Sequence, residues 1–186
     1  MRSVKVYTAN IGEKDIPRDD IECFSSYSHF KNPARNAKIY KVLPHLYMET
    51  DYSIWIDASI KLLISPEEII DMMESDVMVF KHPTRDCIYD EAIECIKCEL
   101  DHISTISNQA CEYRKKGHKK NSGLAMCGFI ARKHTEEVAR MNERWWAEIC
   151  RHSVRDQISF PIAFPTAQKL DSSLIEKVIK INDHLR

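Results

Sequence analysis

Short runs of β-branched and aromatic residues alternate along this chain with segments that carry helix start signals. The runs predict strands at residues 4–7, 52–57, 76–80 and 123–132. The segments between them predict helices at residues 33–46, 65–75, 87–116 and 135–150, with a closing helix over 172–186. This alternation favours an α/β fold in which helices flank a mixed, mostly parallel sheet. A length of 186 residues predicts one compact domain over residues 1–186.

The composition excludes several classes of protein. A formal net charge of −1 gives no overall field toward nucleic acid or a membrane surface. The N-terminus is too short and too polar for a signal peptide, and no apolar run is long enough to span a membrane. Seven cysteines without a regular framework indicate reduced thiols, so we expect a soluble, cytoplasmic protein. The sequence leaves open whether a further domain follows in a longer natural chain.

Polar side chains stand at the ends of three successive predicted strands. The first strand leads into residues 7–10, and the second ends in Asp57 with Ser59 close behind it. The third is followed by Lys81, His82, Arg85 and Asp86. Ligands of open α/β sheets bind beyond the carboxyl ends of the strands. The three strand ends therefore predict a binding site along one edge of the sheet.

The helix predicted over residues 33–46 brings two cations toward this edge. Asn32 is expected as its N-cap and Pro33 as its first residue. At about 100° per residue, Arg35 falls within the apolar stripe of the helix and Lys38 falls at the edge of that stripe. Near a helix N-terminus such cations suit a phosphate ligand. Pairing with carboxylates of the protein itself is the alternative.

A carboxylate at the end of an apolar strand, such as Asp57, is costly unless a charged or hydrogen-bonding group meets it. Asp57 could cap the following turn by accepting backbone N–H groups. It could equally bind a divalent cation, because Mg²⁺ usually needs only one or two carboxylates when substrate phosphates supply the remaining ligands. Such a cation, with Arg and Lys side chains beside it, would bind a pyrophosphate and stabilise it as a leaving group.

Several of these segments resemble a known family. DYSIWIDASI, residues 51–60, is similar to the central strand of GT-A glycosyltransferases, where an Asp-x-Asp-type motif holds metal and nucleotide. NPARNAKIYKVLPH, YSIWIDASI, FKHPTRDCIYDEA and RDQISF together resemble a glycosyltransferase family that includes plant mucilage-related proteins, and similar small domains occur in large DNA viruses of algae. The resemblance spans about residues 4–160. Ser59 stands where a second aspartate would complete the motif, so Asp57 is the expected ligand for Mn²⁺ or Mg²⁺, and the need for metal stays open.

The resemblance implies a GT-A-like glycosyltransferase of the hexosyl or deoxyhexosyl type. The implied donor is a nucleotide sugar, with a UDP-sugar expected first, and the acceptor is a hydroxyl group of a glycan or glycoconjugate. The residues expected at the base and ribose are Tyr7, Thr8, Ala9 and Asn10. Those expected at the diphosphate are Arg35, Lys38, Asp57 and Ser59. Those expected at the sugar pocket or its lid are His82, Arg85 and Asp86, for which a local turn and a helix cap are the alternatives.

The segment 151–160 supplies the candidate catalytic residues. Asp156 and Gln157 fall in a predicted polar turn between a Trp-bearing helix and an apolar run. In the fold class that the resemblance implies, a carboxylate so placed can receive the acceptor proton or face the anomeric carbon, as in glycoside chemistry generally. Inversion and retention both stay open. A surface ion pair between Asp156 and Arg155 is the alternative.

Two further features have simpler interpretations. Cys95 and Cys98 have the spacing of a zinc pair, but they fall in a helical stretch and a structural zinc site needs four ligands. The basic run 114–120 is interpreted as a solvated helix end with Gly117 as its cap, and a loop over the acceptor is the alternative. Two other functions are the alternatives to a glycosyltransferase. A nucleotidyltransferase would normally bring a Gly-rich phosphate loop after the first strand, and a nucleic-acid-binding module would use the basic run, which the net charge disfavours.

Overall fold

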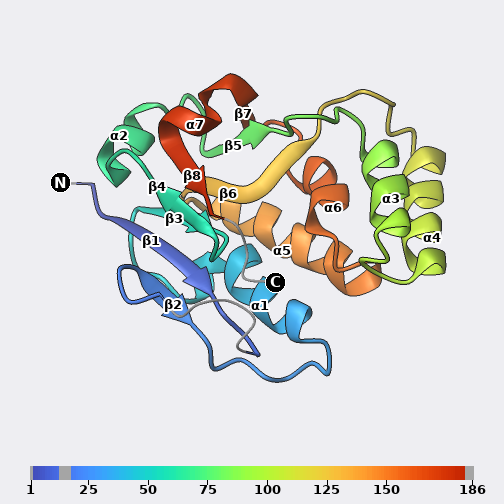
Figure 1. Ribbon diagram of the computed structural model, residues 1–186, viewed down its shortest axis with the longest axis horizontal. Coiled ribbons are helices and arrows are strands. Elements are labelled where there is room, and N and C mark those ends of the chain that lie inside the picture. The colour runs from blue at the N-terminus through green and yellow to red at the C-terminus, as the bar shows by residue number, and fades with distance from the viewer. Residues whose placement is uncertain (1, 13–17, 183–186) are drawn as a thin grey trace.

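The computed structural model describes residues 2–12 and 18–182, and Figure 1 shows how their helices and strands are arranged. The strands are β1 (Val4–Ala9), β2 (Glu22–Phe24), β3 (Tyr52–Ile56), β4 (Ile60–Leu62), β5 (Val77–Lys81), β6 (Ala125–Lys133), β7 (Gln168–Leu170) and β8 (Ile179–Ile181). The helices are α1 (Pro33–Val42), α2 (Pro66–Asp71), α3 (Ile88–Lys97), α4 (Ile103–Lys115), α5 (Glu136–Arg151), α6 (Asp156–Ala163) and α7 (Ile175–Val178). Two short 3-10 turns are η1 (Pro44–Leu46) and η2 (Ser172–Leu174).

One six-stranded sheet has the order β2-β1-β3-β6-β5-β7. β1 pairs in parallel with β2 and β3, and β5 pairs in parallel with β7. β6 is antiparallel to both of its neighbours, β3 and β5. The prediction of a mixed, mostly parallel sheet flanked by helices is therefore confirmed. The carboxyl ends of β1, β3 and β5 share one edge, but β6 stands between β3 and β5, so only β1 and β3 end side by side.

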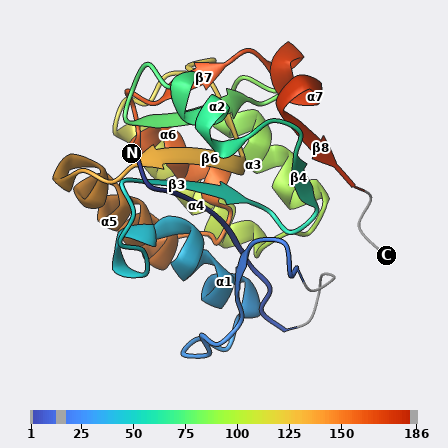
Figure 2. The same cartoon turned by 90° about the vertical axis from the view of Figure 1, so that its left-hand side faces the viewer.

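Helices cover both faces of this sheet. Figure 2 shows α1 and α5 on one side of the sheet and α2 and α7 on the other. Alternate residues of each strand point to opposite faces. Tyr7 and Trp55 pack in one core cluster with Trp145 of α5, whereas Ile54 and Ile56 pack in a second cluster with α2 and β8. A third cluster fills the space between α3, α4 and α6.

The predicted helix starts and one predicted helix end are confirmed. The Asn32 side chain accepts a backbone N–H of the first turn of α1, and Pro33 is the first residue of that helix. Ser65 and Glu68 form a reciprocal capping box at the start of α2. Gly117 follows α4 with a φ of 85°, the left-handed conformation that ends a helix without a steric penalty.

Other boundaries differ from the prediction. α1 ends at Val42 instead of residue 46, because Pro44 has no N–H with which to continue the helical hydrogen bonds. The long stretch 87–116 is divided into α3 and α4. The predicted closing helix is wrong for residues 172–182: only η2 and the short α7 are helical, and Ile179–Ile181 then pair with β4 as strand β8. The β-branched residues of this segment favour a strand over a helix, and residues 183–186 lie outside the described part.

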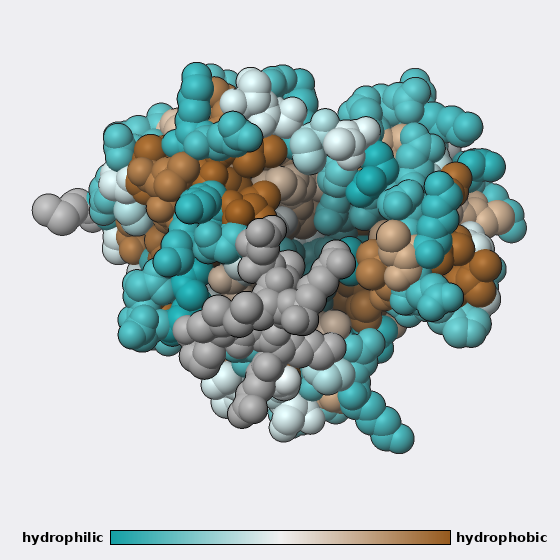
Figure 3. Space-filling view, viewed as in Figure 1, coloured by the Kyte–Doolittle hydropathy of each residue, from teal (hydrophilic) through white to brown (hydrophobic). Residues whose placement is uncertain are grey.

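Within the described part of the chain, no helix is both long and apolar enough to cross a membrane. In the view of Figure 3, apolar side chains gather in the region of β4, α7 and β8, and again over α3 and α4. Leu63 and Ile181 are exposed in the first region, and Ile93 and Ile103 in the second. The surface is hollowed between these two regions (Figure 3).

Candidate functional site

The ends of β1 and β3 meet the first part of α1 at a cleft of about 230 Å³. Its polar lining comes from Lys38, Lys41 and Asp57, and its apolar lining includes Ala34 and Ala37 on α1. The N-terminal half of a helix that faces such a cleft favours an anion, because its free N–H groups and its dipole are positive there. The cleft lies where the sequence predicted a ligand site.

Asp57 directly follows β3, and its main chain is fixed on two sides. Its N–H donates to the Gly128 carbonyl at 2.8 Å, and its carbonyl accepts the Ile60 N–H at 2.8 Å. Its Oδ1 accepts hydrogen bonds from the indole Nε1 of Trp55 at 2.8 Å and from the Lys41 Nζ at 3.2 Å. The carboxylate at the end of this apolar strand therefore meets an indole N–H and a lysine.

Gly128 of β6 leaves room for the Asp57 side chain. A Cβ atom at position 128 would lie 3.2 Å from Asp57 Oδ2 and 3.1 Å from Ile60 Cδ1. Contacts that short force one of the neighbours to move. A glycine on β6 is therefore what allows the carboxylate to pack beside that strand.

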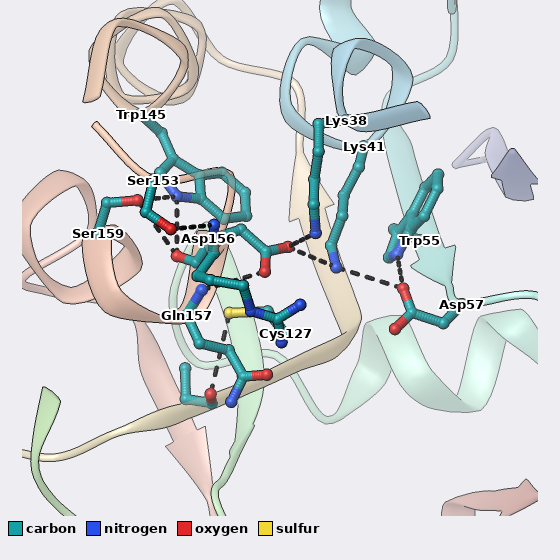
Figure 4. A network of polar contacts seen from close by, with 12 residues as sticks. Lys38, Lys41, Trp55, Asp57, Cys127, Trp145, Ser153, Asp156, Gln157 and Ser159 are labelled. Atoms are coloured by element: carbon teal, nitrogen blue, oxygen red, sulfur yellow. Dashed lines mark hydrogen bonds and ion pairs between the residues drawn. The ribbon is translucent and has the colours of Figure 1, made fainter. Parts of the chain in front are cut away.

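Lys41 is the central charge of the site, and it was not among the residues predicted from the sequence. Its Nζ lies 2.7 Å from Asp156 Oδ2 and 3.2 Å from Asp57 Oδ1, and 5.5 Å from the centre of the Trp55 ring (Figure 4). Burial alone would lower the pKa of Lys41, but the carboxylates of Asp156 and Asp57 outweigh burial and raise that pKa above its usual range. A signal for Lys41 was present, because it is three residues from Lys38 and such positions are neighbours on a helix.

Asp156 is the buried partner of both lysines. It is the first residue of α6, so the predicted polar turn is wrong, and it is only 3% exposed, so the surface-pair alternative is wrong as well. Its Oδ2 lies 2.6 Å from Lys38 Nζ and 2.7 Å from Lys41 Nζ. Burial would raise the pKa of this carboxyl, but Lys38, Lys41 and Arg155 hold the pKa of Asp156 well below its usual range. Burial lowers the pKa of Lys38, and Asp156 opposes that effect.

The catalytic roles of Asp156 and Gln157 stay predictions. The Asp156 carboxylate is turned toward the lysines of α1, and its Oδ1 accepts the backbone N–H of Gln157 at 3.1 Å. The Gln157 side chain is partly exposed and extends away from the two lysines (Figure 4). Contact between Asp156 and an acceptor would therefore require the lysines to move.

β1 contributes less to the cleft than predicted. The side chains of Tyr7 and Thr8 are 0% exposed, because helices cover both faces of the sheet at that point. The Tyr7 hydroxyl accepts a hydrogen bond from buried Arg132 at 3.3 Å. These two side chains therefore do not face the cleft, and contact of this strand end with a base and ribose stays a prediction. Ala9 does line the cleft, and Asn10 follows it, half-buried, with its N–H donating to the carbonyl of Phe24.

Arg35 does not accompany Lys38 into the cleft. Its Nη2 donates to the Ile149 carbonyl at 3.4 Å, and its guanidinium carbon lies 5.7 Å from the centre of the Phe30 ring. The apolar stripe of α1 does face the protein, as predicted, but at Arg35 it meets the last turn of α5. A cation is favoured there by the partial negative charge of a helix C-terminus. The predicted contact of Arg35 with a diphosphate is not supported by this orientation.

A second polar cluster stands at the end of β5. Arg85 Nε donates to Glu91 Oε2 at 2.7 Å, and Arg85 Nη2 lies 3.0 Å from His82 Nε2. Burial, together with the charge of Arg85, lowers the pKa of His82, so its imidazole is neutral at neutral pH. Asp86 is exposed, and it does not cap α3, whose N-cap is Cys87 without a side-chain capping bond. Glu91 is 3% exposed and is the partner that the sequence did not predict for Arg85.

Arg155 connects the two clusters. Its charge lowers the pKa of Asp156 on one side and opposes the effect of burial on Cys95 on the other. Burial nevertheless raises the pKa of the Cys95 thiol to about 11, and that thiol donates to Glu91 Oε1 at 3.4 Å. Polar side chains from β3, α1, α6 and α3 thus form a continuous series along this edge of the sheet.

The predicted divalent cation at Asp57 has few other protein ligands available. Ser59, at the position of the second motif aspartate, is half-buried, and its carbonyl accepts the Asn182 N–H at 2.9 Å. Across residues 2–12 and 18–182, no group of three or more His, Cys, Asp or Glu side chains is placed to hold a metal ion, which includes Cys95 and Cys98. A Mn²⁺ or Mg²⁺ ion at Asp57 stays a prediction, for which Oδ2 is the oxygen that accepts no hydrogen bond from a described residue.

Comparison with known proteins identifies the family of this chain. Residues 24–182 match the family model described as TOD1/MUCI70, glycosyltransferase-like domain. The alkaline ceramidase TOD1 of Arabidopsis thaliana is 40% identical over 154 residues, which cover 75% of this chain and 33% of that protein. The chain thus spans about a third of that relative. A solved apo structure of the bifunctional glycosyltransferase WbbM aligns with a TM-score of 0.46 and 16% identity over 80% of this chain and 26% of that one. Because the family model covers most of its length, this chain belongs to the TOD1/MUCI70 family of glycosyltransferase-like domains.

Proposed function

We propose that this chain transfers a sugar from a nucleoside-diphosphate donor to a hydroxyl group of a glycan or glycoconjugate. The observation that carries the proposal is the cleft at the ends of β1 and β3, where the N-terminal half of α1 and the ammonium groups of Lys38 and Lys41 face one space. In this reaction the acceptor hydroxyl group loses its proton and its oxygen bonds to the anomeric carbon, while the bond from that carbon to the phosphate oxygen breaks. The diphosphate leaves with that electron pair, so positive charge held beside it stabilises the transition state.

The finer features of the proposal come from the resemblance and remain to be measured. They are a UDP-sugar as donor and a hexosyl or deoxyhexosyl group as the transferred sugar. A cytoplasmic location is proposed from the seven cysteines, all of which are free thiols. His82, Arg85 and Asp86, at the end of β5, are proposed to face the sugar.

A thermal-shift screen of UDP, GDP, CDP and ADP and of their sugar conjugates tests the proposal. Ligand present at about 100 times its dissociation constant adds about 2.7 kcal/mol to the free energy of unfolding, which is readily detected. A bound nucleotide sugar that is then hydrolysed slowly, with release of the nucleoside diphosphate, supports a transferase. A nucleotidyltransferase would instead form a nucleotide sugar from a nucleoside triphosphate and a sugar 1-phosphate, with release of pyrophosphate. Ceramide hydrolysis is assayed in parallel, because a relative is named as a ceramidase; hydrolysis without nucleotide binding contradicts the proposal.

Ala34→Glu is expected to weaken nucleoside-diphosphate binding without harming the fold. Ala34 is exposed on the first turn of α1 and lines the cleft, so a glutamate there would repel the diphosphate. Because like charges brought together cost several kcal/mol, the dissociation constant should rise by at least about tenfold. An acidic side chain in a first helical turn is favourable, so the melting temperature should not fall.

The control for Ala34→Glu is Ser107→Glu, at an exposed position of α4 that does not line the cleft. Calorimetric titration of both variants with the tightest nucleotide of the screen is the measurement. Equal affinity of the two variants would mean that the cleft beside α1 is not the donor site.

A further inference from the structure

The buried side chains beside the cleft carry more positive than negative charge. Asp156 is surrounded by Lys38, Lys41 and Arg155, all of which lower its pKa. The side chains of Lys41 and Asp156 are each 4% exposed, and that of Lys38 is 17% exposed. Three cations around one buried carboxylate leave two positive charges without a buried counter-charge among the described residues. Two charges are what a divalent metal ion would bring to the same place.

The second carboxylate, Asp57, does not cancel this excess within the protein interior. Its side chain is 47% exposed, so water screens its charge much more than it screens the buried groups. The Arg85–Glu91 pair at the end of β5 is balanced within itself. The positive excess therefore lies at Lys38 and Lys41, on the wall of the cleft.

Lys41 is also held in place before any ligand arrives. Asp156 and Asp57 contact its ammonium group at 2.7 and 3.2 Å, and the Trp55 ring lies 5.5 Å away (Figure 4). An ammonium group has three protons, so two carboxylate contacts leave one proton for a ligand oxygen. Among the described residues, Lys38 contacts one carboxylate, that of Asp156, which leaves two of its protons for a ligand. A preorganised cation costs little reorganisation when negative charge develops beside it.

The hydrogen bonds that Asp57 already accepts favour its pairing with Lys41 over metal binding. Its Oδ1 already accepts from Trp55 Nε1 and Lys41 Nζ. A metal bound through that oxygen would have to displace both donors, and a metal bound through Oδ2 would have Asp57 as its one carboxylate ligand among the described residues. Ser59, in the place of the second aspartate, contributes no carboxylate.

We propose that Lys38 and Lys41, held by the buried carboxylate of Asp156, neutralise the leaving diphosphate in the position that a divalent cation would otherwise take, so that nucleotide binding does not require a metal. This inference rests on the proposed function, because it assigns a role within the same donor site. Asp156 is then a positioning residue, because its carboxylate holds the ammonium groups of Lys38 and Lys41 at the wall of the cleft. Asp57 contacts the Lys41 ammonium group from the more exposed side.

The test is calorimetric titration of the chain with UDP, GDP and inorganic pyrophosphate, in excess EDTA and again in saturating MnCl₂. The expected result is binding in EDTA. Saturating MnCl₂ should change the dissociation constant by less than about threefold, which corresponds to less than about 0.7 kcal/mol of binding free energy. Binding that appears only with MnCl₂ overturns the inference and leaves the proposed function standing. No binding in either condition overturns both.

Asp57→Asn gives opposite results if Asp57 holds a metal ion and if the lysines hold the diphosphate. Because the Asp57 side chain is half-exposed, the substitution should change the free energy of unfolding little. If Asp57 holds a metal, the variant loses affinity and its response to MnCl₂. If the lysines hold the diphosphate, the variant binds in EDTA as tightly as the wild type or more tightly, because the asparagine Oδ1 can still accept from Lys41 while one repelling charge is gone. A loss of affinity for all three probes in EDTA would overturn the inference.

Lys41→Met completes the test, with Lys61→Met at an exposed position of β4 as its control. Losing a charge-assisted hydrogen bond costs about 1.5–3 kcal/mol, so the dissociation constant in EDTA should rise by about 10- to 100-fold. Lys38→Met should show a loss of the same kind, and it leaves the Lys41–Asp156 pair in place to maintain the fold. Unchanged affinity of a folded Lys38→Met or Lys41→Met protein would contradict the proposal.

Discussion

Replacing Asp156 by asparagine is expected to lower the free energy of unfolding by about 3–5 kcal/mol, because removing one partner of a buried ion pair leaves the other charge uncompensated. Here two ammonium groups, those of Lys38 and Lys41, would lose a carboxylate at 2.6 and 2.7 Å. At neutral pH the melting temperature should fall by roughly 10 °C for a domain of this size. Urea unfolding followed by circular dichroism measures the effect.

The effect of Asp156→Asn should depend on pH in one direction. The folded-state pKa of Asp156 is depressed, so its contribution to stability is present above the ordinary carboxyl pKa of about 4 and is lost as the pH falls below it. The stability difference between wild type and variant should therefore shrink in acid. Asp71→Asn is the control, because that carboxylate is 71% exposed and its ion pair with Arg2 should contribute at most about 1 kcal/mol. A difference independent of pH would mean that lost packing, and not lost charge, explains the result.

Replacing Trp145 by alanine should destabilise the fold by a similar amount, about 3–5 kcal/mol, which is usual for a large aromatic side chain removed from a core. Trp145 is 0% exposed and packs edge-on against Phe160 and Phe164 of the α6 region. Its Nε1–H lies 3.2 Å from the carbonyl oxygen of Asp156 and 3.1 Å from Ser159 Oγ. The indole therefore supports the turn of helix that positions the Asp156 carboxylate.

Two further variants separate the contributions of Trp145. Trp145→Phe keeps an aromatic ring but removes the donor, so it should cost less than the alanine change and should still weaken diphosphate binding through Asp156. Trp146→Ala is the control, because Trp146 is only partly buried and packs at the edge of the core against Phe30. Equal destabilisation by Trp145→Ala and Trp146→Ala would refute the assignment of Trp145 as the central packing residue.

Local sequence patterns were enough to predict the main strands, the starts of α1 and α2 and the class of fold. The run Tyr52–Ile56 forms β3, and the caps at Asn32 and Ser65 begin α1 and α2. These features depend on residues within a few positions of one another, so a pattern along the chain contains the needed information. The position of Asp57 at the end of a buried strand, and hence the place of the cleft, could be read in the same way.

Only the tertiary structure decided which charges meet in that cleft. α1 carries Arg35, Lys38 and Lys41 at helical spacing, and the sequence does not say which of them faces which neighbour. The packing of α5 turns Arg35 to a carbonyl at a helix end, and the start of α6 brings Asp156 between the two lysines. Contacts between groups far apart in sequence are fixed by how whole elements pack, because burial of a charge is tolerated only where packing supplies an opposite charge.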